Sequence, residues 1–245
     1  MFEGDFTHYV ELTSGLKQEG AVVPCYQPIL DREQRRVGVE ALARYRRHDH
    51  YDSIPFERLD ADTVLAIDIT MLHAIIDDLP RLASHNVQVL SINLTPDRTS
   101  PVYRNLLRLI LVRARKVAIT IWFEVLEVAP LHSHQLQFIA TLRSHGARIV
   151  LDDFGTEACN FQRMLVQPYD VIKLDRSLLL QACDDQHATE MLRGLVDYLH
   201  RLDMEVVCEG IESAHHGALC EYIGCDYAQG FAYGRPSPLE QWHSA

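Results

Sequence analysis

The sequence lacks several features that would assign a chain quickly to a class of protein. No apolar run approaches the roughly 20 residues that a membrane-spanning helix needs, and residues 1–15 carry acids where a secretory signal would carry basic residues. The six cysteines form no C-x-x-C pair, so neither a zinc ribbon nor a thioredoxin-type redox site is indicated. No H-E-x-x-H motif occurs either. We therefore expect a cytoplasmic protein with free thiols and no membrane association.

Basic residues are also scarce, with 23 Lys and Arg against 34 Asp and Glu and a formal net charge of −11. A surface that binds nucleic acid regardless of sequence needs clustered basic residues, so DNA is not an expected partner. A small anionic ligand held through metal ions remains compatible with this charge. The 245 residues contain no linker, low-complexity run or repeat. They predict a single domain over 1–245, with an N-terminal helical cover over 1–20 and a barrel over 21–240.

The most informative stretch is RIVLDDFGT at 148–156. Three apolar residues run into Asp152 and Asp153, and Gly155 follows, which predicts a buried parallel strand that ends in a loop. Neighbouring residues on a strand point to opposite faces, so the two acids can face one way only if the strand stops there. Adjacent carboxylates repel each other, and a bound cation usually offsets this repulsion. For a single pair, however, a helix cap plus a solvated acid is the better explanation.

The same pattern recurs along the chain, and this recurrence favours a cation site over a helix cap and a solvated acid. Seven strand-like runs, most of them separated by helix-like stretches, each deliver a polar residue at the carboxyl end. These residues are Glu40, Asn93, Glu124, Asp152 with Asp153, Lys173, Glu209 and Gln229. In a closed α/β barrel such ends share one rim, where the chemistry takes place. Carboxylates, an amide and a lysine there suit a site for hard cations beside a group that handles a proton.

Prolines and charged turns modify the expected barrel. Pro24 and Pro28 predict an edge or irregular strand at 22–30, and the charged turn at 31–36 predicts an antiparallel hairpin with the next strand. Residues 45–62 are interpreted as a loop. Apolar spacing predicts helices over 8–19, 63–82, 101–115, 133–145, 157–167, 177–182, 186–202 and 213–223, the last capped by Gly224. The predicted fold class is α/β, a modified (β/α)₈ TIM-type barrel with one antiparallel strand.

Seven motifs in this order resemble the EAL-domain family of bacterial cyclic di-GMP phosphodiesterases. They are VEALAR at 39–44, INLTP at 92–96, EVLE at 124–127, LDDFGT at 151–156, IKLDRS at 172–177, CEGIES at 208–213 and QGFAYGRP at 229–236. The resemblance covers nearly the whole chain, from YQPI at 26–29 onward. It implies that two Mg²⁺ or Mn²⁺ ions activate a water to cut one phosphodiester of cyclic di-GMP, which releases linear pGpG. It also implies a homodimer.

The resemblance also assigns roles to individual residues. Glu40, Asn93, Glu124 and Asp152 match ligands of the first metal ion, Asp152 and Asp153 match ligands of the second, and Glu209 lies near it. The predicted catalytic set is Lys173, Glu40, Glu209 and Glu127. Lys173 matches the lysine that touches the attacking water, and it would either accept a proton or orient that water; Glu127 would tie down the loop after the paired aspartates. The predicted substrate-side residues are Gln27, Arg44, Asp175, Glu212 and Gln229, and a helix N-cap is the alternative for Asp175.

One departure from the family lies in the loop after the paired aspartates, where Glu157 stands in place of a glycine. Glutamate resists backbone angles that glycine permits, so we expect a looser loop and weaker binding of the second ion. Ca²⁺ should occupy the site, misplace the water and inhibit.

Two other functions compete with hydrolysis. One is an EAL-like module that binds cyclic di-GMP without hydrolysing it and acts through a regulatory protein partner. The other is a metal-dependent aldolase or lyase, which leaves the order of the motifs unexplained. Because all the metal-site groups are present, an active phosphodiesterase is favoured. No fused sensor domain is recognised, so control through expression or a protein partner is expected.

Overall fold

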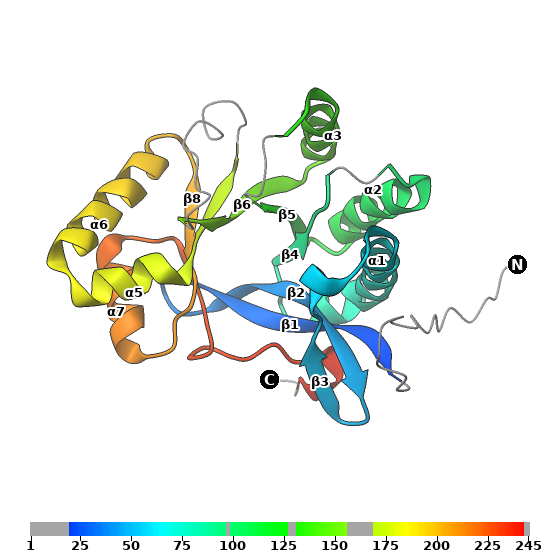
Figure 1. Cartoon of the computed structure of the whole chain (residues 1–245), viewed down its shortest axis with the longest axis horizontal. Coiled ribbons are helices and arrows are strands. Elements are labelled where there is room, and N and C mark those ends of the chain that lie inside the picture. Colours follow the sequence, from blue (N-terminus) through cyan, green and yellow to red (C-terminus); the bar gives the residue numbers. More distant parts are fainter. Residues whose placement is uncertain (1–19, 97–98, 127–130, 156–168, 243–245) are drawn as a thin grey trace, which may run out of the picture.

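The computed structural model describes residues 20–96, 99–126, 131–155 and 169–242 (Figure 1). The predicted helices over 8–19 and 157–167 lie outside these ranges, as do Glu127 and Glu157.

Eight strands of the described chain close into a barrel, and this confirms the predicted fold class. Around the barrel the order is β1-β9-β8-β7-β6-β5-β4-β2, and β2 pairs again with β1. The β1 strand is antiparallel to both neighbours, while the other barrel pairs are parallel. The bounds are β1 Ala21–Asp31, β2 Arg36–Arg47, β4 Val89–Asn93, β5 Thr120–Leu126, β6 Arg148–Phe154, β7 Val171–Leu174, β8 Glu205–Cys208 and β9 Tyr227–Gln229.

The predicted hairpin is formed by β1 and β2. Its two prolines lie at positions where a missing N–H does not remove a hydrogen bond between the two strands. The N–H of Tyr26 points away from β2, because it donates to Ser237 O at 2.8 Å. Pro24 and Pro28 share this side of β1 by the two-residue period of a strand. On that side β9 pairs only with Ile29–Asp31. Each proline therefore lacks a donor for which none of the described strands offers an acceptor.

The prediction of a loop over 45–62 was wrong in its first part. β2 continues to Arg47 and turns back at His48, which has a φ of +50°, into the strand β3 (His50–Ser53). A 3₁₀ turn, η1 (Phe56–Arg58), follows. The strand was missed because β3 lies outside the barrel and is largely exposed, so its polar residues show no hydrophobic alternation.

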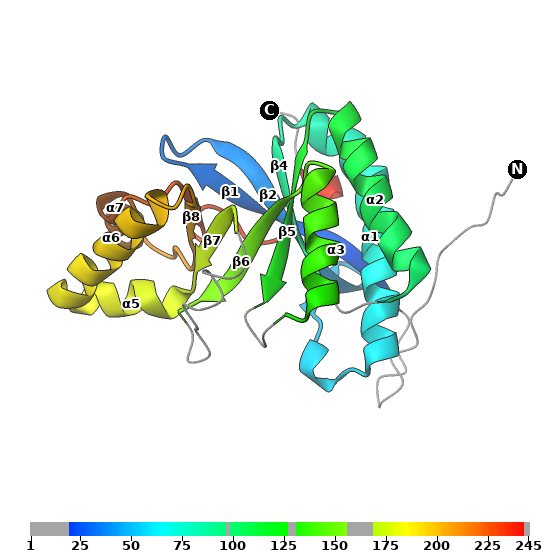
Figure 2. The same cartoon turned by 90° about the horizontal axis from the view of Figure 1, so that it is seen from above.

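Helices flank the barrel in two groups, with α1, α2 and α3 on one side and α5, α6 and α7 on the other (Figures 1 and 2). The bounds are α1 Ala61–Ser84, α2 Pro101–Lys116, α3 Ser133–Ser144, α5 Arg176–Asp184, α6 Gln186–His200 and α7 Ala214–Ile223. These agree with the predictions to within two residues at each end. Gly224 caps α7 with a φ of +87°, as predicted. Within the described ranges, no helix combines the length and the apolarity that crossing a membrane requires.

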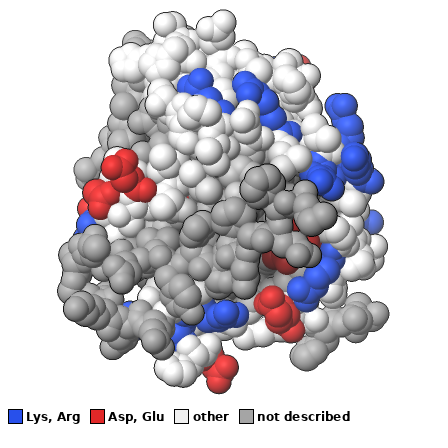
Figure 3. All heavy atoms as spheres, turned by 90° about the vertical axis from the view of Figure 1, so that its right-hand side faces the viewer, with Lys and Arg blue, Asp and Glu red and all other residues white. Residues whose placement is uncertain are grey.

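Charged side chains are dispersed over the face of the molecule shown in Figure 3. The Lys and Arg residues described there occupy several separate places, with uncharged residues between them.

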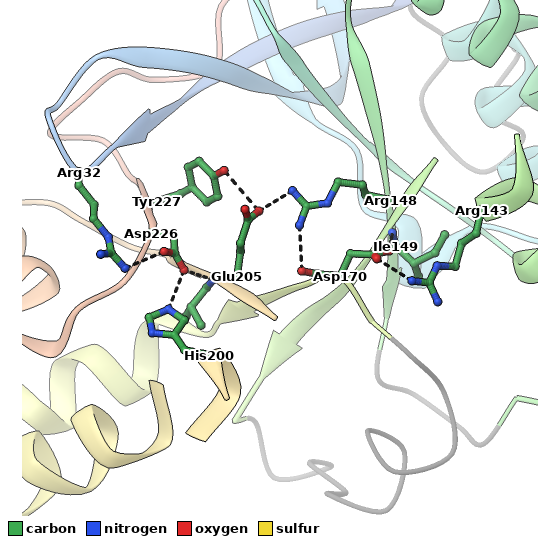
Figure 4. A network of polar contacts seen from close by, with 10 residues as sticks. Arg32, Arg143, Arg148, Ile149, Asp170, His200, Glu205, Asp226 and Tyr227 are labelled. Atoms are coloured by element: carbon green, nitrogen blue, oxygen red, sulfur yellow. Dashed lines mark hydrogen bonds and ion pairs between the residues drawn. The ribbon is translucent and has the colours of Figure 1, made fainter. Parts of the chain in front are cut away.

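A network of charged side chains ties the amino-terminal ends of the strands together (Figure 4). Asp226, just before β9, accepts hydrogen bonds from Arg32 Nη2 at 2.6 Å and from the Val206 backbone N–H at 2.8 Å, and it lies 2.8 Å from His200 Nε2. Arg148, at the start of β6, donates to Glu205 at the start of β8 at 2.5 Å and to Asp170 O, just before the intervening β7, at 3.1 Å. In barrels of this kind, this rim contributes stability while the opposite rim carries the chemistry.

Replacing Asp226 with alanine should lower the free energy of unfolding by about 2 kcal/mol, because it leaves the buried Val206 N–H without its acceptor. The ion pair with Arg32 should add little, since the Arg32 side chain is 53% exposed. Urea unfolding measures the difference, and Asp226→Asn should recover part of it. The exposed Asp197 on α6 offers a matched control, Asp197→Ala; an equal loss in both variants would contradict a specific role for the network.

Candidate active site

The period of the strands places the polar rim residues inside the barrel. Trp122, Val150, Val171 and Val207 are buried and form one apolar cluster in the barrel interior. Two residues further along each of these strands stand Glu124, Asp152, Lys173 and, just beyond β8, Glu209. Because alternate residues share a face, these four side chains form the next layer above the apolar cluster.

Lys173 lies at the centre of this layer. Its Nζ is 2.8 Å from Glu209, 3.0 Å from Glu124, 3.0 Å from Asp152 and 3.4 Å from Glu40. The lysine side chain is only 2% exposed. The structure thus brings together five of the residues that the sequence predicted for the site.

The paired aspartates share the site through a β-bulge. In the pairing of β6 with β7, Leu151 faces Ile172 and Phe154 faces Leu174, so Asp152 and Asp153 both stand opposite Lys173. Asp153 has a φ of +56°, a left-handed conformation that aspartate tolerates better than most residues. On the sequence alone, both acids were expected to face one way only if the strand stopped at them. Instead, β6 continues to Phe154, and one inserted residue brings both acids to the same side.

One amide and one hydroxyl each hold a carboxylate in place. Gln229 Nε2 donates to Glu40 Oε2 at 2.6 Å and to Gln27 Oε1 at 3.3 Å. The predicted substrate-side residues Gln27 and Gln229 therefore lie directly beside Glu40. Ser91 Oγ donates to Glu124 Oε1 at 2.5 Å. Ser91 was missed from the sequence, although it lies two residues before Asn93 on β4 and so shares its face.

The remaining predicted residues lie farther from the lysine or outside the described ranges. Asn93 stands beside Glu124 in the register of β4 and β5, and it is exposed. Arg44 donates to its neighbour's carbonyl, Ala43 O, at 2.9 Å. Asp175 caps α5 by accepting from Ser177 N at 2.9 Å, the alternative considered for it. Glu212 pairs with Arg176 at 2.7 Å. Glu127 lies outside the described residues.

A cavity of about 510 Å³ adjoins the rim beside β2. Arg44, Asn93 and Thr95 line its polar part, and apolar residues of α1, including Ile67 and Met71, line much of the rest. The sequence did not reveal this cavity, because its walls come from segments that are distant in the chain.

Burial and crowding shift the protonation of the cluster. Burial, reinforced by the charge of Glu40, raises the pKa of Glu124 well above its ordinary value. Burial also raises the pKa of Glu209 to about 7, against the opposing effect of Lys173. For Lys173, burial acts to lower the pKa, but the surrounding carboxylates, with Asp152 first, outweigh it and hold the pKa well above its usual range. In the absence of metal, Lys173 is therefore a cation.

The residues of the cluster fit divalent cations that prefer oxygen ligands. If all four carboxylates around Lys173 are ionised, one ammonium group leaves three negative charges uncompensated. Within the described chain, the buried Glu124 Oε2 accepts no hydrogen bond. Oxygens of Asp152, Asp153 and Glu209 lie within 4.8 Å of one another, close enough to converge on one ion. Carboxylate and amide oxygens are the ligands that Mg²⁺ and Mn²⁺ prefer.

The fold and the cluster define a class of protein: a TIM-type barrel with a buried lysine and converging carboxylates at the carboxyl ends of its strands. Residues 10–236 match the family model of the EAL domain. The chain belongs to the EAL domain family.

Similar proteins agree with this assignment. The chain is 33% identical over 101 residues to PdeA of Escherichia coli K12, named a probable cyclic di-GMP phosphodiesterase; the match covers 41% of this chain and 14% of PdeA. Two solved structures share the fold at 22% identity and cover 91% of this chain. They are YkuI of Bacillus subtilis, in complex with substrate c-di-GMP and calcium (TM-score 0.75, 57% of YkuI), and BlrP1 of Klebsiella pneumoniae, a manganese and cyclic di-GMP complex (TM-score 0.73, 58% of BlrP1).

Proposed function

We propose that the protein is a cyclic di-GMP phosphodiesterase that hydrolyses cyclic di-GMP to linear pGpG with two Mg²⁺ or Mn²⁺ ions. The observation that carries the proposal is the cluster in which Glu40, Glu124, Asp152 and Glu209 all lie within 3.4 Å of Lys173. The name of PdeA supports the substrate, and the manganese complex of BlrP1 supports the use of divalent ions.

The proposed metal ligands are Glu40, Asn93, Glu124 and Asp152 for one ion and Asp152, Asp153 and Glu209 for the other. Two divalent cations held there would polarise the phosphate oxygens and lower the pKa of a water molecule. The chain itself supplies orientation. Gln229 fixes the Glu40 carboxylate at 2.6 Å, and Ser91 fixes Glu124.

Lys173 is proposed to position the attacking water or to take its proton. Four carboxylates hold its ammonium group at the centre of the cluster and keep its pKa high in the absence of metal. Divalent ions in the same cluster would repel its positive charge and favour the neutral amine. The lysine would then be able to accept a proton during the reaction.

Substrate recognition is proposed for residues around the cluster. Arg44 is suited to a phosphate, because its guanidinium donates in a planar fork. It lines the adjoining cavity together with Asn93. Gln27 and Gln229 lie on the other side of Glu40, and Asp175 and Glu212 complete the proposed substrate side.

The direct test is incubation of the purified protein with cyclic di-GMP and Mg²⁺ or Mn²⁺, with the products separated by chromatography. We expect linear pGpG to appear only when a divalent ion is present, and a chelator to stop its formation. Tight binding of cyclic di-GMP without any pGpG would overturn hydrolysis in favour of a regulatory module that acts through a protein partner. Failure to bind the nucleotide at all would overturn both.

Calcium should inhibit the reaction. Ca²⁺ is larger than Mg²⁺ and tolerates looser coordination, so it should occupy the carboxylates and misplace the water. The complex of YkuI with c-di-GMP and calcium supports such occupancy. Adding Ca²⁺ to the Mg²⁺-loaded protein should slow hydrolysis, and excess Mg²⁺ should restore it. Full activity in Ca²⁺ alone would contradict the proposed two-ion site.

A further inference from the structure

Three buried cysteines converge behind the proposed active site. Cys208 is the last residue of β8, Cys220 lies on α7, and Cys225 lies in the turn between α7 and β9. Their sulfur atoms all lie within 4.8 Å of one another, and each residue is at most 5% exposed. The spacing C-x₁₁-C-x₄-C contains no familiar metal motif, so only the fold brings the three thiols together.

Apart from one another, these thiols have few hydrogen-bonding partners in the described part of the chain. Among the described contacts, Cys220 Sγ reaches Tyr227 O and Cys208 Sγ reaches Glu209 O, each at 4.0 Å, the outer limit for sulfur. A buried cysteine commonly serves as a small apolar residue, and one or two would need no other explanation. Three that point at a common centre are a different arrangement, because a packed core does not require its sulfur atoms to converge.

The separations suit a single metal ion. With zinc–sulfur bonds of about 2.3 Å, sulfur atoms on one ion are about 3.8 Å apart in tetrahedral geometry and about 4.0 Å apart in trigonal geometry. The three cysteines therefore need to close by at most about 1 Å to share an ion. Thiolates select soft ions such as Zn²⁺ and Cu⁺ over Mg²⁺ and Mn²⁺, so this centre would not compete for the ions of the carboxylate cluster.

A cavity of about 170 Å³ gives a path to the cluster from solvent. It is lined by Cys220 and Cys225 and also by exposed residues, including Glu221. Gly217 and Tyr233 form part of its wall. Arg32 steadies the turn that carries Cys225, donating to Cys225 O at 3.1 Å and to Gly224 O at 2.9 Å.

We propose that Cys208, Cys220 and Cys225 form a thiolate site for a soft metal ion, Zn²⁺ or Cu⁺, separate from the carboxylate cluster. The ion would hold the end of β8, α7 and the start of β9 together. Three protein ligands complete a trigonal Cu⁺ site. For tetrahedral Zn²⁺ they leave one position open, which the adjoining cavity can supply with water. Because Glu209 directly follows Cys208, the ion would also anchor the residue that the proposed hydrolysis uses, although the metal site does not depend on that hydrolysis.

The test uses Co²⁺ as a spectroscopic substitute for Zn²⁺, on the whole chain in reductant, without oxygen, and with excess Mg²⁺ to fill the carboxylate cluster. We expect one equivalent of Co²⁺ to produce a near-ultraviolet sulfur-to-cobalt band and one equivalent of Zn²⁺ to remove it. Cys208→Ser, Cys220→Ser and Cys225→Ser should each weaken binding by at least about 10–100-fold, the scale known for lesser changes around metal sites. Cys183→Ser, on α5, is the matched control and should bind as the unmodified protein does.

Circular dichroism would show that the variants fold, and added Zn²⁺ should raise the thermal midpoint of the unmodified protein but not of the three variants. Absence of the sulfur-to-cobalt band in the folded, unmodified protein would overturn the proposal without recourse to any variant. So would a band that persists in all three variants. Loss of about 2 Da on mild oxidation, with no metal bound in the reduced state, would replace the metal site with a redox-active cysteine pair.

Discussion

Replacing Lys173 with methionine should lower kcat by about 10²–10⁴-fold, the range expected when a group that handles a proton is lost. Methionine keeps much of the length of the side chain and removes its charge. The substrate should still bind, because its proposed phosphate contacts lie with Arg44 and the ions. A fall confined to kcat would support a role in the transition state, whereas a change confined to KM would show that Lys173 only assists binding.

The same variant should be unstable without metal. Its four carboxylate neighbours would lose the ammonium group that lies 2.8–3.4 Å away, and removing one partner from a buried ion pair costs about 3–5 kcal/mol. Thermal unfolding with and without Mg²⁺ measures this loss, which Mg²⁺ should largely restore. Lys116→Met, at the exposed end of α2, is the matched control and should change neither property. A Lys173→Met protein as stable as the unmodified one in chelator would contradict the proposed role of Lys173 as a counter-ion.

Replacing Glu40 with alanine should reduce turnover by at least about 100-fold and leave the fold intact. Glu40 contacts Lys173 and Gln229, and its loss would remove a proposed metal ligand together with the group that positions the amide. Changes around a metal site that spare the ligands already cost about 10–100-fold, so the loss of a ligand should cost more. The Mg²⁺ concentration for half-maximal activity should also rise.

Activity measured against Mg²⁺ concentration separates these effects. Glu33→Ala, in the exposed turn between β1 and β2, is the matched control for the loss of a carboxylate. Near-normal turnover of Glu40→Ala, with an unchanged dependence on Mg²⁺, would exclude Glu40 from the metal site.

Much of the barrel and of its centre could be predicted from the sequence, because a strand has a simple period. Short apolar runs that end in Glu124, Asp152 or Lys173 place those side chains at one rim, and in the structure Glu124 and Asp152 each lie 3.0 Å from Lys173 Nζ. The antiparallel hairpin followed from a short charged turn. Both predictions rest on local rules that tertiary contacts did not override.

The remainder depended on contacts that sequence periodicity does not encode. β3 has little buried surface, so no apolar alternation marks it. The cysteine cluster joins residues of β8, α7 and the following turn. The 11 and 4 residues that separate these cysteines in the sequence do not predict that the three thiols lie close together. Asp175 illustrates the difference. Its cap on α5 is a local interaction that the sequence predicts, whereas a role of Asp175 in binding substrate depends on distant contacts that the sequence does not predict.

The bulge in β6 has a consequence for the density of ligands at the rim. A regular strand offers the barrel interior one side chain in every two residues, so eight strands supply a limited number of inward groups at any one height. By inserting one residue opposite Lys173, β6 adds Asp153 to the vicinity of Asp152 and Glu209 without lengthening the rim or recruiting another strand. The barrel thereby concentrates more negative charge at one height than its strand number alone would allow, and the left-handed backbone at Asp153 is the local cost.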